Sequence, residues 1–237
     1  MTATDDRRAV RAAALGAASL AGYWLPSTAL VAAPVRRLLG VRAEIDDRGA
    51  VALTFDDGPH PDGTPRVLET LERADARATF FLAGEQVERF PALVAEIVAR
   101  GHEAAVHCQR HRNLMRLPPR AVRHDLDRAE AAIADAAGVA PRRYRPPYGI
   151  LTAPALRHAR RRGWETVLWR RAGSDWRASA TPESIARRLV GKARGGEVLL
   201  LHDADWYAAP GSWRRTAAAL ELVLDRLRER GLRAAPL

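Results

Sequence analysis

The chain has 237 residues and a formal net charge of +10, and hydrophobic residues make up 47% of it against 28% charged residues. This composition excludes an intrinsically disordered chain, and a single cysteine, Cys108, excludes a scaffold held by internal disulfides. A basic surface attracts anions, but no nucleic-acid-binding motif accompanies the arginine-rich run at residues 157–162, so we expect no nucleic-acid partner.

The first 40 residues differ from the rest. Residues 12–35 carry no charge and are flanked by arginines on both sides, Arg7, Arg8, Arg11, Arg36 and Arg37. We expect residues 1–40 to be a signal peptide, a membrane anchor acting through residues 12–35, or an N-terminal lead-in that packs on the domain. The first two alternatives place the protein in the cell envelope or outside the cell, and the third leaves a cytoplasmic location open. We expect residues 41–237 to form one domain, because a chain of this length usually folds around a single core.

From residue 50 onward, short aliphatic and β-branched runs alternate with longer amphipathic stretches, which is the pattern of repeated strand–helix units. The predicted strands cover residues 51–55, 78–82, 103–106, 142–145, 165–169 and 197–201, with a weak seventh near Leu232. Because parallel strands need helical crossovers, these units predict an α/β fold whose parallel sheet closes, or nearly closes, into a barrel.

Several helix boundaries are marked in the sequence. Thr64 before Pro65 and Thr181 before Pro182 each place an N-cap residue ahead of a proline at the first helical position. Glycines at 195 and 196 predict the end of the second of these helices. Apolar residues at helical spacing predict an amphipathic C-terminal helix, namely Leu220, Val223, Leu224 and Leu227.

Polar side chains follow the predicted strands, which is where parallel barrels collect their active-site residues. Asp56 and Asp57 follow the first strand, and His107 and His111 follow the third. The later strands lead to the remaining candidates, Arg145 after the fourth, Asp175 and Trp176 after the fifth, and His202 after the sixth.

Asp57, His107 and His111 form a candidate metal site. Two imidazoles and one carboxylate suit a divalent transition metal, zinc above all, and leave positions open for water and substrate. Each histidine alone is more simply explained as a surface or hydrogen-bonded core residue, but their coincidence with the Asp-Asp turn favours the site. If Asp57 binds the metal, Asp56 is free to act as a base. Arg145 is either its charge partner or an ordinary surface arginine.

The chain resembles the polysaccharide deacetylase family, also called the NodB-homology domain. The resemblance rests on five segments in the family's order, residues 54–59, 107–111, 145–149, 175–176 and 200–203. It implies a distorted (β/α) barrel of about seven parallel strands. It also implies removal of acetyl groups from N-acetylglucosamine polymers such as peptidoglycan or chitin, less often from O-acetylated xylan, so that the partner is a polysaccharide of the cell envelope.

The resemblance also implies roles for individual residues. Asp56 is the general base, oriented by Arg145, and His202 is the general acid. A divalent metal, with zinc favoured over cobalt, nickel or manganese, is held by Asp57, His107 and His111. The backbone N–H of Tyr148 helps to hold the oxyanion, and Asp175 is a further catalytic residue. The implied substrate-binding residues are Pro147, Trp176 and Leu200.

The sequence departs from the family pattern at two positions. Many members have an acidic residue three places before the Asp of the fourth motif, where this chain has Ala172, so another group must tune His202. Cys108 stands where Ser, Thr or Gly is usual, and we interpret it as a small buried filler.

Other functions use the same residues. Two histidines and a carboxylate also serve Fe(II) in non-haem oxygenases, although the pairing of Asp56 with His202 argues against that chemistry. The same site can hydrolyse a non-sugar amide or an O-acetyl ester, and the fold can persist as a non-catalytic carbohydrate-binding module. Trp206, Tyr207 and Trp213 either stack on sugar rings or pack in the protein.

Overall fold

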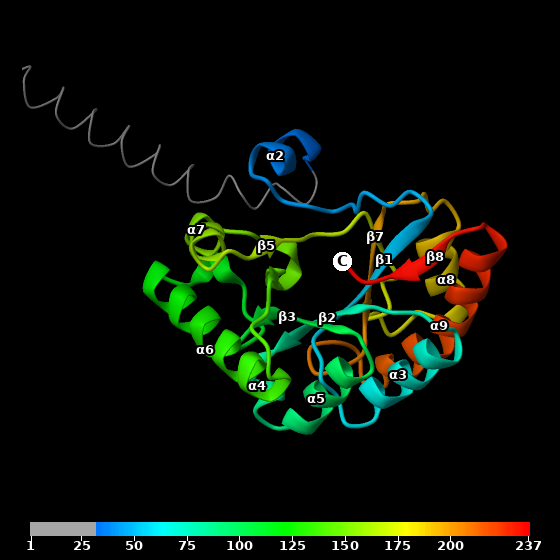
Figure 1. Cartoon of the computed structure of the whole chain (residues 1–237), viewed down its shortest axis with the longest axis horizontal. Helices are drawn as coiled ribbons and strands as arrows, with labels where there is room; N and C mark the ends of the chain where they lie inside the picture. The colour runs from blue at the N-terminus through cyan, green and yellow to red at the C-terminus, as the bar shows by residue number, and fades with distance from the viewer. Residues whose placement is uncertain (1–31) are drawn as a thin grey trace, which may run out of the picture.

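The computed structural model describes residues 32–237, and its centre is one curved sheet of parallel strands (Figure 1). The strands are β1 (Ala50–Asp56), β2 (Thr79–Ala83), β3 (Glu103–Cys108), β4 (Arg143–Tyr144), β5 (Glu165–Thr166), β6 (Arg171–Ala172), β7 (Val198–His202) and β8 (Arg233–Ala235). Their order in the sheet is β5-β4-β3-β2-β1-β7-β6, and β8 pairs with the first residues of β1. Every pairing between these strands is parallel.

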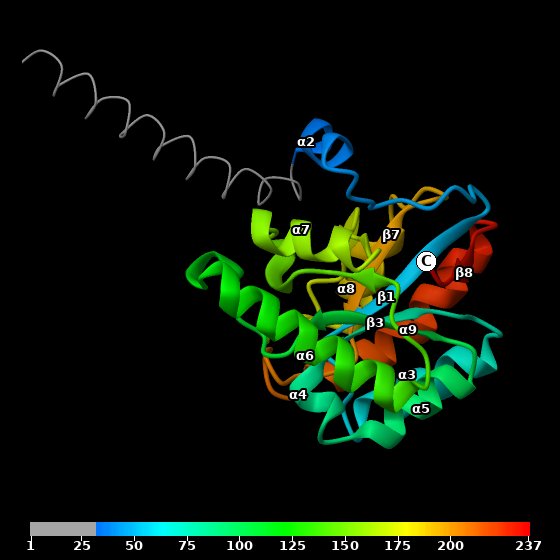
Figure 2. The same cartoon turned by 60° about the vertical axis from the view of Figure 1, so that its left-hand side comes forward.

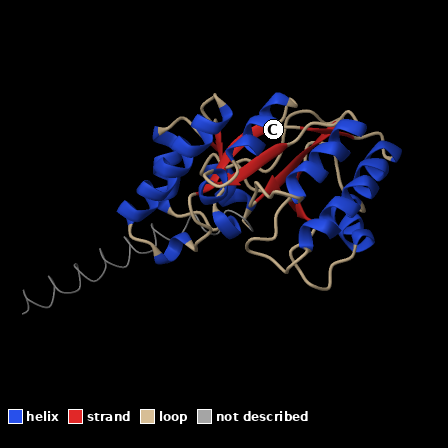
Figure 3. Ribbon diagram, turned by 90° about the horizontal axis from the view of Figure 1, so that it is seen from below, coloured by secondary structure: helices blue, strands red, loops and turns tan. Residues whose placement is uncertain are grey.

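Helices surround the sheet on its outer face (Figures 1 and 2). They are α2 (Ala33–Leu38), α3 (Gly63–Arg73), α4 (Gly84–Val87), α5 (Pro91–Ala99), α6 (Pro119–Ala137), α7 (Ala153–Arg161), α8 (Pro182–Val190) and α9 (Ser212–Glu229), with short 3₁₀ turns at Leu114–Arg116 and Pro147–Gly149. Each main helix packs on the next, in the order α8, α9, α3, α5, α6, α7. Seen from below, the helices lie outside the strands (Figure 3). This is the distorted barrel that the sequence predicts.

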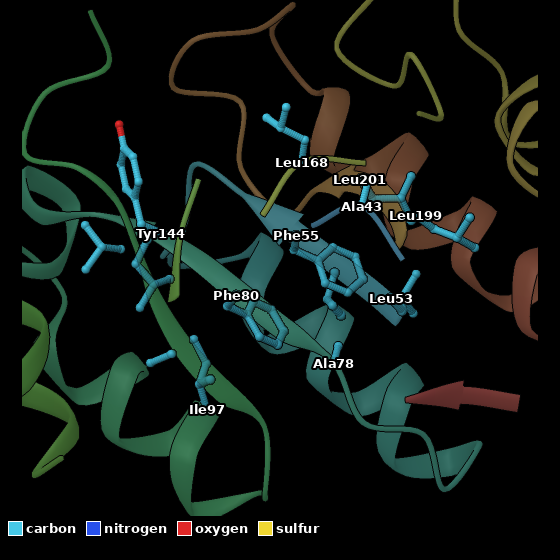
Figure 4. Packing of buried hydrophobic residues seen from close by; sticks show 14 of the residues in the cluster. Ala43, Leu53, Phe55, Ala78, Phe80, Ile97, Tyr144, Leu168, Leu199 and Leu201 are labelled. Carbon is cyan, nitrogen blue, oxygen red and sulfur yellow. The ribbon is translucent and has the colours of Figure 1, made fainter. Parts of the chain in front are cut away.

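The alternation of side chains along β1 separates two interiors. Val51, Leu53 and Phe55 face the helices and join the main core, in which the rings of Phe55 and Phe80 stack with centroids 5.1 Å apart (Figure 4). Ala52 faces the inside of the barrel. Burying a Leu or Phe side chain contributes about 1.5–3 kcal/mol, so the helix-facing layer supplies much of the stability of the fold. The inward face carries a second, smaller cluster, in which Ala52 packs with Phe81 and Ala105.

The segment between α2 and β1 spans the gap in the barrel. Arg42 forms a parallel bridge with Val167, and Glu44 forms an antiparallel bridge with Glu197. The Arg42 carbonyl also accepts a 2.7 Å hydrogen bond from Leu168 N. An extended segment outside the strand–helix repeat therefore joins the β5 side of the sheet to the β7 side.

The fifth predicted strand differs in the structure. The expected strand at 165–169 is reduced to β5, and a separate short strand, β6, follows it and pairs with β7. The residues between them, Val167 and Leu168, are buried and bond to the bridging segment instead of continuing a straight strand. Asp175 therefore follows β6, which the sequence pattern did not predict.

Two of the predicted helix boundaries are also corrected. Helix α3 begins one residue before Thr64, whose hydroxyl bonds to Asp203 instead of capping the helix. Helix α8 ends at Val190, ahead of the expected glycines at 195 and 196. The capping box at its start is confirmed, since Thr181 Oγ1 accepts from Ser184 N at 3.2 Å. The C-terminal helix buries the four predicted apolar residues.

Most of the predicted N-terminal segment lies outside the described residues. Of residues 12–35, only 32–35 are included, and they lead into α2. Val35 and Leu39 pack against the core. Among the helices of residues 32–237, none is long and apolar enough to cross a membrane.

Candidate active site

One cavity at the C-terminal edge of the sheet collects most of the predicted site residues. Its volume is about 250 Å³. It is lined by Asp56, Asp57, His107, His111, Tyr148, Trp169, Trp176, Leu200, His202 and Tyr207. Parallel strands bring these residues together because all of their carboxyl ends lie at the same edge. In particular, Asp56 of β1 is in register with His202 of β7.

Asp57, His107 and His111 converge at this edge. Asp57 Oδ1 lies 3.4 Å from His107 Nε2 and 3.5 Å from His111 Nε2, and the three donor atoms fall within 4.8 Å of one another. Asp57 follows β1 with a φ of 78°, a left-handed conformation that turns its side chain toward the imidazoles. Two atoms that each lie about 2.1 Å from one ion are roughly 3–4 Å apart, so this spacing fits a metal.

The polar atoms of these residues also fit a metal. Among residues 32–237, Asp57 Oδ1 is buried without a hydrogen-bond partner. Burial alone would raise the pKa of Asp57, but the adjacent imidazole of His107 and those of His202 and His111 lower that pKa to about 2. Burial lowers the pKa of His111 to about 4, which favours the neutral imidazole. An ionised carboxylate and a neutral imidazole are the forms that bind metals.

His107 is oriented by a second contact. Its Nδ1 lies 2.8 Å from the carbonyl oxygen of Arg145, the residue that follows β4. With the proton on Nδ1 donated to this carbonyl, the lone pair of Nε2 points to Asp57. The pairing of β3 with β4 therefore fixes one of the candidate ligands.

Asp56 is held by the fully buried guanidinium of Arg145. Arg145 Nη1 donates to Asp56 Oδ1 at 2.6 Å and to Thr54 Oγ1 at 2.9 Å. The guanidinium carbon also lies 4.0 Å from the ring centroid of Phe81, which packs inside the barrel. Arg145 does not line the cavity, so it orients Asp56 from behind.

His202 is held by Asp175, which is itself fully buried. Asp175 Oδ1 lies 3.1 Å from His202 Nδ1, and Asp175 Oδ2 accepts from His202 N at 2.7 Å and from Thr216 Oγ1 at 2.8 Å. Burial alone would lower the pKa of His202, but the charge and hydrogen bond of Asp175 raise it to about 10. Asp175 therefore occupies the tuning role that the sequence left open at Ala172.

Two of the three predicted substrate-binding residues line the cavity, and the third does not. Trp176 and Leu200 line the cavity, and the ring of Trp176 meets His202 edge-on at 5.3 Å. Tyr148 also lines it, with a left-handed φ of 59°. Pro147 is buried and is not among the lining residues.

Comparison with known proteins agrees with this geometry. Residues 43–167 match the polysaccharide deacetylase family. The chain is 36% identical over 213 residues to a chitooligosaccharide deacetylase of Bradyrhizobium sp. strain ANU 289, an alignment that covers 86% of this chain and 94% of that protein. The chain therefore belongs to the polysaccharide deacetylase family.

Two further relatives support this assignment. A peptidoglycan-N-acetylglucosamine deacetylase of Bacillus cereus is 33% identical over 187 residues, which cover 79% of this chain and 66% of that protein. The crystal structure of the Bc1960 peptidoglycan N-acetylglucosamine deacetylase superposes with a TM-score of 0.77 at 30% identity, covering 83% of this chain and 90% of that one.

In this polysaccharide deacetylase, the sequence pattern left open whether Tyr207 lines the cavity and gave no signal for Trp169. Trp169 and Tyr207 line the cavity, whereas Trp206 and Trp213 pack on His60 with ring centroids 4.7 Å and 5.5 Å away. Their aromatic character was visible in the sequence. No local pattern distinguished a ring that lines the cavity from a ring that packs beside it.

A buried carboxylate, Asp203, was also missed as a structural support. It bonds to Thr64, and a side chain at Gly58 would meet Asp203 Oδ2 at 2.5 Å. Glycine therefore lets the turn after Asp57 approach the end of β7 closely. Burial raises the pKa of Asp203 to about 7. Its position directly after His202 was the only signal in the sequence.

Proposed function

We propose that this polysaccharide deacetylase removes N-acetyl groups from an N-acetylglucosamine-type polysaccharide of the cell envelope, such as peptidoglycan or chitin, in a metal-dependent reaction. One observation carries the proposal. The donor atoms of Asp57, His107 and His111 face the same cavity as Asp56 and His202, which lie in register on neighbouring strands. A metal site, a base and an acid thus share one substrate-sized space.

Asp57, His107 and His111 would hold the metal. Their mixed nitrogen and oxygen donors favour zinc, with cobalt, nickel and manganese as alternatives. When bound, such an ion polarises the amide carbonyl and makes a nearby water molecule a better nucleophile.

Asp56 acts as the general base in this proposal. It lines the cavity, and Arg145 holds one of its oxygens, so the carboxylate is oriented to accept a proton from the attacking water. The hydroxide then forms a bond to the acetyl carbon. Arg145 is a positioning residue because it lies behind Asp56 and does not reach the substrate.

His202 acts as the general acid. Breaking the C–N bond needs a proton on the departing amine, and Asp175 keeps His202 oriented and favours its protonated form. We assign the backbone N–H of Tyr148 to the developing oxyanion, and Trp176 and Leu200 to the wall around the acetyl methyl group. Acetate and a free amine leave the cavity.

The proposed N-acetylated sugar is supported by the relatives, which are deacetylases of peptidoglycan N-acetylglucosamine and of chitooligosaccharides. Such substrates agree with a location in the cell envelope or outside the cell.

Acetate release tests the proposal. The full chain is incubated with peptidoglycan, chitin oligomers and acetylxylan, with and without a metal chelator, and acetate is measured. We expect release from an N-acetylated polymer, its loss in chelator and its return with added zinc. Release only from acetylxylan would reassign the substrate to an O-acetyl ester. Oxygen consumption with a 2-oxo acid, without acetate release, would indicate an iron oxygenase. Polymer binding without either reaction would indicate a binding module.

A further inference from the structure

Tyr207 lies against one of the candidate metal ligands. It belongs to the loop between β7 and α9, and its ring stacks on the imidazole of His111 with centroids 4.6 Å apart and an angle of 12° between the planes. The hydroxyl at the far end of the ring is anchored on α4. It donates to Glu85 Oε1 at 2.5 Å and accepts from Gln86 Nε2 at 3.3 Å.

The two candidate histidine ligands are supported in different ways. His107 lies within β3, and its Nδ1 meets the carbonyl of Arg145. His111 lies in the loop between β3 and the 3₁₀ turn at Leu114–Arg116, and within residues 32–237 its buried Nδ1 has no hydrogen-bond partner. Metal-binding histidines almost always donate the second ring N–H to a fixed acceptor, which sets the orientation of the ring. His111 therefore needs another support.

Two tyrosine rings contact the imidazole of His111. Tyr148 meets it edge-on, with centroids 4.4 Å apart and planes at 65°, while Tyr207 lies flat against it. Tyr148 is 55% exposed, so the protein encloses less of its ring. Tyr207 is half-buried and tied to α4 at its hydroxyl, so its ring plane is the fixed one. A flat ring against the imidazole limits its rotation about the Cβ–Cγ bond.

We propose that Tyr207 is a positioning residue that holds His111 in metal-binding orientation by ring stacking, in place of the missing hydrogen bond at Nδ1. The stack leaves His111 Nε2 facing Asp57 Oδ1 at 3.5 Å. This inference rests on the proposed metal site. The loop after β7 therefore orients a metal ligand, in addition to lining the cavity.

Zinc affinity tests the inference directly. Full-length Tyr207→Leu and Tyr207→Phe variants are compared with the unmodified chain by competition with a chromogenic chelator. Because the loss of an orienting partner typically weakens metal binding 10–100-fold, we expect about that loss for Tyr207→Leu. Tyr207→Phe keeps the stacked ring but loses the hydroxyl that ties it to α4, so we expect a smaller loss of zinc affinity than in Tyr207→Leu, a partial rescue by the conservative variant.

Trp206→Leu is the matched control. Trp206 belongs to the same loop but packs on His60 and Phe90 instead of His111. Its zinc affinity should stay unchanged. Unchanged affinity in Tyr207→Leu, or an equal loss in Trp206→Leu, would overturn the inference. If the unmodified chain binds no zinc, the metal site itself is wrong and the role of Tyr207 with it. If zinc binds but acetate is never released, the proposed reaction alone is refuted.

Discussion

Asp56 and Asp57 are neighbours in the chain with different surroundings. Asp56 is the last residue of β1 and meets the guanidinium of Arg145, while Asp57 turns through a left-handed φ toward the two imidazoles. This difference predicts that the two carboxylates separate functionally.

We expect Asp57→Ala to abolish zinc binding and Asp56→Asn to retain it. Asn still accepts from Arg145 but cannot take a proton, so kcat should fall by about 10²–10⁴. Zinc binding and acetate release, measured on the same preparations, check both outcomes. An Asp56→Asn protein that deacetylates normally would show that the base is another residue.

Arg145 and Asp56 form a buried ion pair, and removing one partner should destabilise the fold. We expect Arg145→Met to lower the free energy of unfolding by about 3–5 kcal/mol, because a buried carboxylate loses its charged partner. Urea denaturation measures the change.

The double variant Arg145→Met with Asp56→Asn is the control for this prediction. Without a charge on either side, it should recover part of the lost stability. If the double variant loses as much stability as the sum of the losses in Arg145→Met and Asp56→Asn, the two side chains do not stabilise one another.

At the scale of elements, the turn from α5 into β3 carries a buried histidine. His102 Nδ1 accepts from Ala78 N at 3.3 Å, and burial, together with Arg77 and Arg100, lowers the pKa of His102 from 6.5 to about 4. The unfolded chain therefore takes up the proton at a higher pH than the folded one. Stability is full above about pH 6.5 and falls as the pH drops toward 4.

Between pH 7 and pH 5 we expect protonation of this histidine to lower the free energy of unfolding by about 2 kcal/mol. The His102→Gln variant does not titrate there, so its unfolding free energy should fall less than that of the unmodified chain over the same interval. Urea denaturation at both pH values checks the prediction. Parallel pH profiles for the two proteins would contradict it.

Element boundaries show where local patterns succeed and fail. Thr181 caps α8 as its sequence predicts, because the capping box uses only residues within four positions. Thr64 carries the same Thr-Pro signal, yet its hydroxyl goes to Asp203, 139 residues away in the chain. A tertiary partner thus displaced the local one. The same cause shortens the strand after Glu165, where the bridging segment pairs with Val167.

At the scale of the whole molecule, metal binding should stabilise the folded state. The candidate ligands come from the turn after β1, from β3 and from the loop after β3, and they converge only when the sheet has formed. Zinc at 100 times its dissociation constant should add about 2.7 kcal/mol to the free energy of unfolding. For a chain of this size we expect Tm to rise by about 5–10 °C.

Thermal unfolding with and without zinc measures this shift. Asp57→Ala should lose it, whereas Asp46→Ala, which removes a fully exposed carboxylate, should keep it. An equal shift in both variants would mean that zinc stabilises the protein at another site.

The sequence by itself determined the strand–helix alternation, the parallel barrel and the residue types at its C-terminal edge. These depend on hydrophobic periodicity and on strand ends, which are local properties of the chain. The sequence therefore predicts together the site residues Asp56, Asp57, His107, His111 and His202.

The sequence proposed Arg145 as a partner of Asp56, but only the tertiary structure showed the contacts that support the site residues. Asp175 meets His202 across 27 positions in the chain, Arg145 meets Asp56 across 89, and Tyr207 reaches His111 from a loop in a different strand–helix unit. Such contacts depend on how the units pack side by side. The hydrophobic periodicity of one strand–helix unit does not indicate which side chains of another unit will contact it.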